Sequence, residues 1–504
     1  MGTKPIVDES FDALYRAAEK ERAPFSVLEE GYIADISDGI ISVKALPGVA
    51  YFELLDLPDD LFALALNITR EAVQAIVLGD YTSLRVNDRV RHSGQSITIP
   101  VGYELLGKCI DPLARELDSK EAIPTKERYP IEQEAIELIR RDFVQEPLYT
   151  GIKIIDAMIP IGKGQRELII SDASLGKSAV AVDAIINQNG RDVLCVYVAI
   201  GQKKTQIARV IEDLRRSGAL AHTVVLAAPA DVAAGMKFIA PYAGCAIAEY
   251  FRDQGKDVLI VYDDLTKHAD AYRNISLLHE IPPGREAYPG DIFFIHARLL
   301  ERAGKRDDKY NGGSITALPV IETQAGRISD YIPTNLISIT DGQIYFDREL
   351  FNTGFLPAID IRKSVSRIGG KAQVPALKRV ASKLKLDYSQ FLEVEVFTKF
   401  GTRVEAETQK LIDRGRALRI ALKQDRFSPL DLPAQVAVFF LSNEGYLEKL
   451  APGEIAAYTE AFIEMLEDNH PGIRHTLTVT GTLDDALYER LKRIADDFDR
   501  VWQP

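Results

Sequence analysis

The residues best suited to chemistry lie in one short run between a predicted strand at 167–170 and a predicted helix at 179–186. The run reads Ser171-Asp172-Ala173-Ser174-Leu175-Gly176-Lys177-Ser178. It is nearly the phosphate loop G-x-x-x-x-G-K-[ST], in which N–H groups at a helix start hold phosphate oxygens, the lysine reaches the terminal phosphates and the hydroxyl faces Mg²⁺. Ser171 replaces the first glycine of that motif. We expect these eight residues to bind a nucleotide; a chance strand–turn–helix with a lysine cap is the alternative.

A carboxylate follows a second apolar strand further along the chain. The run Val258–Tyr262 is followed directly by Asp263-Asp264. A buried strand that ends in a carboxylate at the carboxyl edge of a parallel sheet is the usual position for a residue that orients Mg²⁺. We therefore expect Asp263 and Ser178 to hold Mg²⁺. Many strands end in aspartate, so this assignment depends on the phosphate loop.

Short alternating runs, broken by turns, extend from about Tyr32 to Val101. The Asp38-Gly39 pair between two apolar runs is a strong signal for a hairpin. We predict a small all-β barrel or sandwich. Its strands are expected at Tyr32–Ser37, Ile40–Leu46, Ala50–Leu57, Leu61–Ile68, Ala75–Leu78 and Ser96–Val101.

Long apolar runs alternate with helical patterns from about Gly102 to Lys371. Such runs fit strands that are buried on both faces of a mostly parallel sheet. The predicted strands are Leu168–Ile170, Val193–Ile200, Val224–Ala228, Val258–Tyr262, Ile292–His296 and Leu336–Thr340. Helical stretches such as Val404–Leu422 and Leu483–Trp502 dominate the rest of the chain.

The different apolar patterns of these regions predict a multidomain protein. We expect a helical segment over residues 1–24, with a charged helix at 9–22, and a β-barrel domain over 25–95. A nucleotide-binding α/β domain is expected over 96–373 and an α-helical domain over 374–504.

Composition narrows the class of protein. The 504 residues are 46% hydrophobic and 27% charged, which is typical of a soluble globular protein and excludes fibrous and disordered classes. The net charge of −13 argues against a nucleic-acid partner bound through bulk charge. Three widely spaced cysteines give neither a disulfide framework nor a metal motif. No signal peptide and no apolar run of ~18 residues is visible, so we expect a cytosolic protein or one on the surface of something larger.

Further segments carry a resemblance to a known family. They are Pro160–Glu167, Val198–Lys203, Ala240–Ala246, Glu249–Asp253, Pro282–Asp291, Glu322–Gly326, Ser338–Ile344 and Ser364–Gly369. Together with the phosphate loop, they resemble the α subunit of F-type ATP synthases. The resemblance covers nearly the whole chain, and its motifs are long and in the family's order.

The resemblance implies an architecture and a set of partners. The architecture is a β-barrel crown, a RecA-like nucleotide-binding domain and a helical C-terminal domain. Three α would alternate with three β around a central γ shaft, with a δ or equivalent peripheral-stalk subunit at the N-terminal segment. ATP or ADP and Mg²⁺ are the implied cofactors. The complex would sit on the cytoplasmic side of a bacterial plasma membrane, which this chain contacts only through the membrane sector.

The resemblance also divides the chemistry between subunits. The catalytic sites belong mainly to β, whereas α supplies an interface, a regulatory nucleotide site and one catalytic arginine. Gln202 occupies the position where catalytic relatives carry a glutamate base, and a neutral amide is a far poorer base. The chain alone is therefore expected to bind nucleotide, with Gln202 and Gln424 at the site, without turning it over. A solvent-facing glutamine in a loop is the alternative.

Arg367 is the arginine that the resemblance places in the neighbouring β site, against the γ-phosphate. A planar, permanently charged guanidinium suits charge that is spread over phosphoryl oxygens. Ser364, in the same segment, is assigned to that catalytic site as well. Without the flanking match, Arg367 would be read as a solvated or salt-bridged arginine.

The sequence departs from the family where α holds its own nucleotide. Ser171, Ala173, Ser174 and Leu175 replace Gly, Arg, Gln and Thr. Leu356 and Arg426 replace an arginine and a glutamine, and Glu280-Ile281 replaces a pair of arginines. A serine at position 171 would add a Cβ where the backbone can need glycine. Because Leu175 and Leu356 remove polar contacts, we expect a site that is weakened ~10–100-fold.

The same residues leave two alternatives to this function. A self-sufficient hexameric ATPase of the same superfamily, such as a secretion motor or a termination helicase, needs a glutamate base in its own chain, and Gln202 speaks against it. A ring scaffold without nucleotide function is disfavoured by the retention of Lys177, Asp263 and Arg367.

Overall fold

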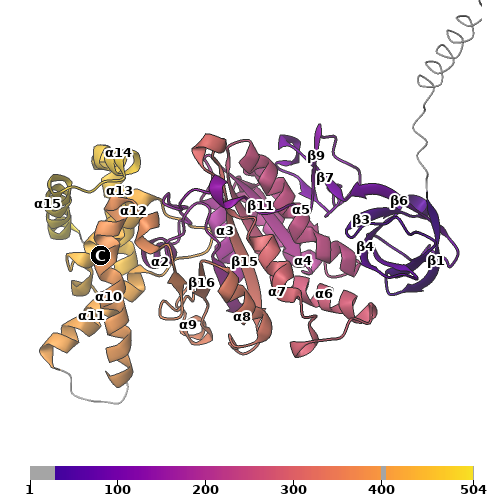
Figure 1. Cartoon of the computed structure of the whole chain (residues 1–504). Coiled ribbons are helices and arrows are strands. Elements are labelled where there is room, and N and C mark those ends of the chain that lie inside the picture. Colours follow the sequence, from indigo (N-terminus) through magenta and orange to yellow (C-terminus); the bar gives the residue numbers. More distant parts are fainter. Residues whose placement is uncertain (1–28, 399–404, 503–504) are drawn as a thin grey trace, which may run out of the picture. The chain divides into compact units, whose positions relative to one another are not determined.

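The computed structural model describes residues 29–398 and 405–502 (Figure 1). The helical segment expected over residues 1–24 lies outside this range. The chain divides into two compact units, one ending at Ser96 and the other beginning at Ile97. Each unit is described by itself.

The first unit is a closed antiparallel barrel. Its strands are β1 (Glu30–Ser37), β2 (Ile40–Lys44), β3 (Glu53–Asp56), β4 (Phe62–Ile68), β5 (Val73–Val77) and β6 (Arg89–Ser96), arranged in the order β1-β2-β5-β4-β3-β6. The barrel is filled by side chains such as Ile33, Ile41 and Leu55. The Asp38-Gly39 hairpin is confirmed, because Ser37 pairs with Ile40 across it.

One predicted barrel strand was wrong. Residues Thr98–Val101 form β7, which pairs with β9 (Glu127–Pro130) in a separate two-stranded sheet of the second unit. The barrel is closed instead by β6, whose sequence RVRHSGQS is largely polar. Pairing with β1 and β3 satisfies the backbone of β6, so this strand forms without the apolar alternation that the prediction required.

The second unit contains a nine-stranded sheet in its described part. Eight strands run in the order β17-β16-β10-β15-β13-β11-β12-β8, and β14 pairs with β15 beside them. The bounds are β8 (Cys109–Ile110), β10 (Leu168–Asp172), β11 (Val193–Ile200), β12 (Thr223–Ala228), β13 (Asp257–Asp263), β14 (Gly304–Lys305), β15 (Ser314–Thr323), β16 (Gly342–Tyr345) and β17 (Val365–Ser366). All pairings are parallel except those of β14 and β17. The strands predicted at the positions of β10 to β13 are confirmed.

Two predicted strands are helices. Ile292–His296 lies in α7 (Ile292–Leu300), and Leu336–Thr340 overlaps α8 (Tyr331–Ile339). In α7, Phe293 and Phe294 are exposed and the buried positions have helical spacing: Ile292, Ile295, His296, Leu299 and Leu300. A short apolar run does not distinguish a strand from a buried helix. The central strand β15 was not predicted at all.

Helices cover the sheet and form the C-terminal part of this unit. Those near the sheet are α2 (Lys153–Met158), α3 (Lys177–Ile186), α4 (Lys204–Arg216), α5 (Ala234–Asp253), α6 (Leu265–Leu278) and α9 (Arg348–Asn352). The C-terminal ones, orange to yellow in Figure 1, are α10 (Pro375–Thr398), α11 (Ala406–Ala421), α12 (Leu432–Asn443), α13 (Ile455–Asn469), α14 (Pro471–Thr480) and α15 (Asp485–Val501). One apolar core runs from the sheet into these helices, and α2 packs against α10. Among the described helices, none has both the length and the apolar composition to cross a membrane.

Candidate functional site

The parallel strands bring the predicted site residues to one edge of the sheet. β10, β13 and β15 run in the same direction and end at Asp172, Asp263 and Thr323. The loop after β10 leads into α3, whose first residue is Lys177. The free N–H groups at the start of α3 therefore lie beside the carboxylates that end the neighbouring strands.

Ser171 does not strain the loop. It lies within β10, its side chain is fully buried, and its Oγ donates a hydrogen bond of 2.7 Å to the carbonyl of Asp172. Within the loop, positive φ occurs at Ser174 (66°) and Gly176 (103°), not at Ser171. The expectation that a serine at this position needs a glycine backbone is therefore wrong, since strand backbone accepts any residue with a side chain.

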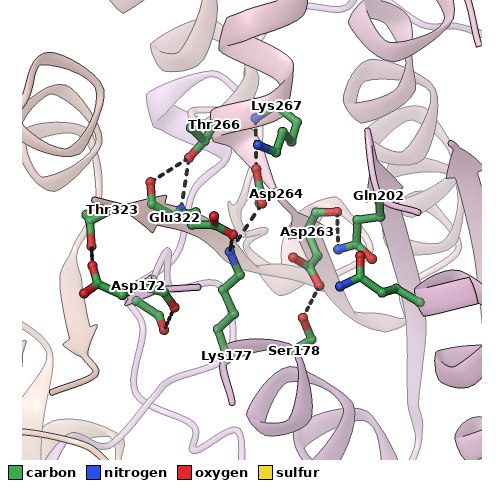
Figure 2. A network of polar contacts seen from close by, with 12 residues as sticks. Asp172, Lys177, Ser178, Gln202, Asp263, Asp264, Thr266, Lys267, Glu322 and Thr323 are labelled. Carbon is green, nitrogen blue, oxygen red and sulfur yellow. Dashed lines mark hydrogen bonds and ion pairs between the residues drawn. The ribbon is translucent and has the colours of Figure 1, made fainter. Parts of the chain in front are cut away.

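Lys177 is held between two carboxylates (Figure 2). Its Nζ lies 2.7 Å from Oε2 of Glu322 and 3.4 Å from Oδ2 of Asp264. Burial lowers the pKa of Lys177, but the negative charges of Asp264, Asp263 and Glu322 raise it by more, so the net shift is upward. Burial raises the pKa of Asp264 to about 6. The charge of Lys267 also lowers the pKa of Asp264, so two ammonium groups act on these carboxylates.

Asp263 and Ser178 form the second part of the cluster. The hydroxyls of Ser178 and Tyr197 both donate to Oδ2 of Asp263, each at 2.6 Å. Oδ1 of Asp263 is buried and has no hydrogen-bond partner in the described part of the chain. Gln202 donates from Nε2 to the backbone carbonyl of Asp263 at 3.0 Å. A buried, unsatisfied carboxylate oxygen beside a serine hydroxyl suits a hard cation such as Mg²⁺, which uses one or two carboxylates plus phosphate oxygens and water.

Asp172 stabilises the start of the phosphate loop through contacts with neighbouring elements. Its Oδ1 accepts hydrogen bonds from Oγ1 of Thr323 at 2.7 Å and from the N–H of Gly326 at 2.8 Å, and its Oδ2 pairs with Arg348 at 2.9 Å. Burial raises the pKa of this carboxyl group, but these contacts together lower it by more, so the net shift is downward. The side chain of Asp172 therefore ties β10 to the end of β15 and to α9. Ala173, next in the loop, is exposed.

Two adjoining pockets flank the phosphate loop. The first, of ≈ 310 Å³, is bordered by Lys177, Ser178, Gln202, Asp264 and Glu322. The second, of ≈ 550 Å³, is mainly apolar. Its lining includes Ile152, Leu175, Val180, Phe346, Phe351, Leu356, Pro357 and Gln424. The volume and apolar character of the second suit a planar ring, and the charged first pocket suits phosphate.

Arg367 lies near the amino end of β10, and Ser364 lies beside Tyr345, the last residue of β16, which pairs with Ile170 of β10. The N–H of Arg367 donates to the carbonyl of Asp341, and the Asp341 carboxylate accepts from Arg166, which comes just before β10. The phosphate loop follows the other end of β10. Arg367 is exposed, whereas Ser364 is buried: its Oγ donates to the carbonyl of Asp360 and accepts from the N–H of Tyr345. The structure therefore does not bring either residue to Lys177.

Sequence reasoning missed two residues of the cluster. Tyr197 was read as one more apolar residue of a strand. Glu322 lies near the end of β15, and that strand was overlooked. The signal was present, because the run from Ser314 to Ile321 ends in a carboxylate in the same way as the run before Asp263.

Known proteins of one family are similar to this chain along nearly its whole length. The ATP synthase alpha/beta family, nucleotide-binding domain, matches residues 151–366, and the ATP synthase alpha/beta chain, C terminal domain, matches residues 373–498. The chain is 46% identical over 481 residues to an ATP synthase subunit alpha of Petrotoga mobilis, which covers 95% of each chain. It is 43% identical over 502 residues to one of Clostridium kluyveri, covering 100% of this chain and 99% of the relative. An ATP synthase subunit alpha 2 of Syntrophotalea carbinolica is 48% identical over 456 residues, 90% of this chain and 87% of its own.

Proposed function

The chain belongs to the ATP synthase alpha/beta family and is the α subunit of the catalytic sector of an F-type ATP synthase, and on this premise we propose that it acts in trans. In this proposal the chain lends Arg367 to the catalytic site of a β subunit and holds a nucleotide of its own without turning it over. The observation that carries the proposal is the position of Arg367 relative to the phosphate loop.

Arg367 lies too far from the chain's own loop to serve it. The two are at opposite ends of β10, which has five residues and is therefore about 13 Å long at ~3.3 Å per residue. The Arg367 side chain is exposed, and its charge lowers the pKa of the buried Glu167 without an ion pair within 4.0 Å among the described residues. An exposed guanidinium that forms no ion pair is available to a phosphoryl group on a neighbouring subunit. Ser364 supports it by fixing the backbone before β17, since its hydroxyl bonds two backbone groups.

The chain's own site is proposed to bind without hydrolysing. Gln202 lies beside Asp263, but a carboxamide cannot take a proton from water. The carboxylate of Asp263 accepts the hydroxyls of Ser178 and Tyr197 and is assigned to Mg²⁺. The carboxylates of Asp264 and Glu322 are both engaged by Lys177. A self-sufficient ATPase would need a free carboxylate base at this place.

Mg²⁺ and nucleotide fit the residues that are present. Ser178 and the unsatisfied Oδ1 of Asp263 would hold Mg²⁺, and Lys177 with the N–H groups of α3 would hold the phosphates. The pocket beside the loop has more basic than acidic residues on its border, so its charge suits a polyphosphate. The basic residues are Lys177, Lys203, Arg209, Lys267 and Arg426, and the acidic ones are Asp213, Asp264 and Glu322.

The leucines at positions 175 and 356 weaken this site. Leu175 is buried in the apolar core, and Leu356 borders the ring pocket with 42% of its surface exposed. Neither side chain can donate a hydrogen bond to the ligand. Two lost contacts at ~1 kcal/mol each weaken binding by about thirtyfold.

The partners are proposed from the family. A β subunit is the direct partner, in a ring of three α and three β around a γ shaft, with a δ or equivalent stalk subunit at residues 1–24. No nucleic acid is involved. The complex is proposed to sit on the cytoplasmic side of a bacterial plasma membrane, attached only through its membrane sector.

Purification with and without a β partner tests the proposal. We expect ATP hydrolysis at a normal enzyme rate and the mass of a six-membered ring only when β is present. The chain alone should show essentially no turnover, because Gln202 is not a base. Normal turnover by the β-free chain would contradict the proposal and favour a self-sufficient hexameric ATPase.

A further inference from the structure

Arg367 directly follows a very short strand. The N–H of Arg367 donates to the carbonyl of Asp341 at 2.9 Å, and β17 before it pairs with β16 at Gly342 and Gln343. A strand of two residues provides few backbone hydrogen bonds. The direction of the Arg367 side chain therefore depends on what holds Ser366, the residue before it.

The hydroxyl of Ser366 bonds three groups. Its Oγ donates to the carbonyl of Pro160 at 2.7 Å and accepts from Nε2 of Gln165 and from the N–H of Gly369, each at 3.1 Å. Pro160 and Gln165 belong to the segment that leads into β10, and Gly369 follows Arg367. The Ser366 side chain therefore joins the segment that carries Arg367 to the segment that enters the sheet.

Gln165 has no spare donor. Its side chain is fully buried, and its Nε2 donates to Oε2 of Glu167 at 2.7 Å as well as to Ser366. Its Oε1 accepts the N–H of Gly162 at 2.8 Å. A carboxamide has two N–H donors, and both are used here. These bonds define one orientation of the carboxamide, so Gln165 is a rigid link between Glu167 and Ser366.

The carboxyl group of Glu167 lies against the start of β16. Glu167 is fully buried, and a Cβ at Gly342 would overlap both of its carboxyl oxygens and the carbonyl of Val365. A glycine at position 342 thus leaves the room that this carboxyl group occupies. Gly342 pairs with Ser366, so Glu167 lies under the strand pair that precedes Arg367.

The surroundings of Glu167 favour the neutral acid. Burial raises the pKa of Glu167 well above its usual range, and the charge of Asp341 adds to this effect. The hydrogen bond from Gln165 and the charges of Arg367 and Lys385 oppose it without reversing it. A neutral carboxyl group can be replaced by an amide that accepts the same hydrogen bond.

Glu167, Gln165 and Ser366 therefore form one buried network that ends at the residue before Arg367. A guanidinium that acts on a neighbouring subunit needs a rigid backbone beneath it, because a misplacement of about 1 Å can cost ~100-fold in rate. We propose that Gln165 and Glu167 are positioning residues for Arg367, which fix the backbone from which the guanidinium reaches the β site. The inference rests on the proposed role of Arg367 and adds the residues on which its geometry depends.

Steady-state ATP hydrolysis by complexes assembled with β tests this inference. Gln165→Met keeps the length of the side chain and removes its carboxamide. We expect kcat to fall at least about tenfold, with KM unchanged, because the arginine acts on charge that develops in the transition state. Nucleotide binding to the chain's own site should not change, since Gln165 lies before β10 and the phosphate loop follows it.

Two substitutions at Glu167 separate the hydrogen bond from the charge. Glu167→Leu removes the acceptor for Gln165, so kcat should fall as it does in Gln165→Met. Glu167→Gln keeps an acceptor and should retain most of the wild-type kcat. Equal turnover of these two variants overturns the inference, and this comparison decides if Gln165→Met does not assemble.

Gln188→Met is the matched control. Gln188 is also buried, and its carboxamide donates to the carbonyls of Tyr149 and Ala184, beyond the end of α3 and away from Arg367. Its loss should lower the thermal midpoint and leave kcat unchanged, which distinguishes positioning of Arg367 from general stability.

A double variant tests whether Gln165 acts through Arg367. Adding Gln165→Met to Arg367→Ala should cause no further loss of turnover, because the guanidinium that it positions is already absent. A wild-type kcat for Gln165→Met, or a further tenfold loss in the double variant, overturns the positioning role and leaves the role of Arg367 standing. Wild-type turnover of Arg367→Ala alone overturns the proposed role of Arg367, and this inference with it.

Discussion

At the scale of single residues, Asp183 couples folding to pH. Burial raises its pKa to about 7, even though the hydrogen bond from Phe427 and the charge of Arg426 lower it. In an unfolded chain the pKa of an aspartic acid is about 3.9. Between these values the folded state holds a proton that the unfolded state lacks. The free energy of unfolding therefore falls as pH rises from about 4 to about 7. Above that range, ionisation of Asp183 has its full cost in stability.

Asp183→Asn removes this cost, because an amide does not ionise. We expect the variant to raise the thermal midpoint of the nucleotide-free chain at pH 8, and the gain to shrink towards zero at pH 4. Thermal unfolding followed by circular dichroism across this range measures it. Asp425→Asn, at an exposed carboxyl that borders the ring pocket together with Asp183, should give no such trend. A gain that does not change with pH would show that the carboxyl of Asp183 is not the titrating group.

The residues of the phosphate cluster were predictable to the extent that the local motif contains them. Lys177 and Ser178 follow from the loop, and Asp263 follows from the apolar strand before it. Glu322 and Tyr197 complete the cluster through tertiary packing of β15 and β11, which no local spacing encodes. The suspected strain at Ser171 did not occur, because that residue belongs to the strand rather than to the turn.

At the scale of elements, Lys153 links α2 to the end of α11. The ammonium of Lys153 donates to the carbonyls of Ala421 and Lys423, which the end of α11 would otherwise leave unpaired. Burial lowers the pKa of Lys153 to about 8. The same residue donates its N–H to Gln424, so one lysine fixes both the helix end and the border of the ring pocket.

Lys153→Met should destabilise the chain while keeping most of the apolar stem. One buried carbonyl loses its donor at about 1–3 kcal/mol and one partly buried carbonyl loses its donor at a lower cost, so we expect a thermal midpoint lower by several degrees. Differential scanning calorimetry measures this. Lys423→Met, which alters an exposed side chain and leaves its carbonyl in place, is the control. An unchanged midpoint for Lys153→Met would contradict the role of the ammonium as a cap.

The sequence predicted helix or strand correctly where an apolar run was long or was delimited by turn or charged residues. The barrel hairpin and strands β10 to β13 were predictable because turn residues or charged residues delimit each apolar run. The runs within α7 and α8 were mistaken for strands, since five apolar residues fit either structure and only burial shows the helical period. The strand β6 was missed because its partners in the barrel, not its own apolar residues, stabilise it.

At the scale of the whole molecule, the sheet separates two sets of chemical groups. The carboxyl ends of β10, β13 and β15 carry the nucleotide cluster, and the amino end of β10 lies near Arg367. In a ring of alternating subunits, such a chain presents its own site at one place and an arginine at another. Catalysis by this chain is therefore expected to depend on what Arg367 does in the neighbouring β site.

The turnover of complexes assembled with β and either Arg367→Ala or Lys177→Ala tests this account most directly. Arg367→Ala should leave the chain folded and able to assemble, since an exposed side chain is removed. Steady-state turnover should fall strongly, by up to ~10³–10⁵ as in related phosphoryl transfer and by less where a rotary step limits the rate. Arg367→Lys should rescue poorly, because the paired geometry is lost.

Lys177→Ala in the same complex should impair nucleotide binding to this chain and reduce maximal turnover far less. We expect the loss of Arg367 to reduce turnover far more than the loss of Lys177, with ring assembly intact in both variants. An inactive Lys177→Ala complex beside an active Arg367→Ala complex would contradict catalysis in trans and place the chemistry at the chain's own phosphate loop.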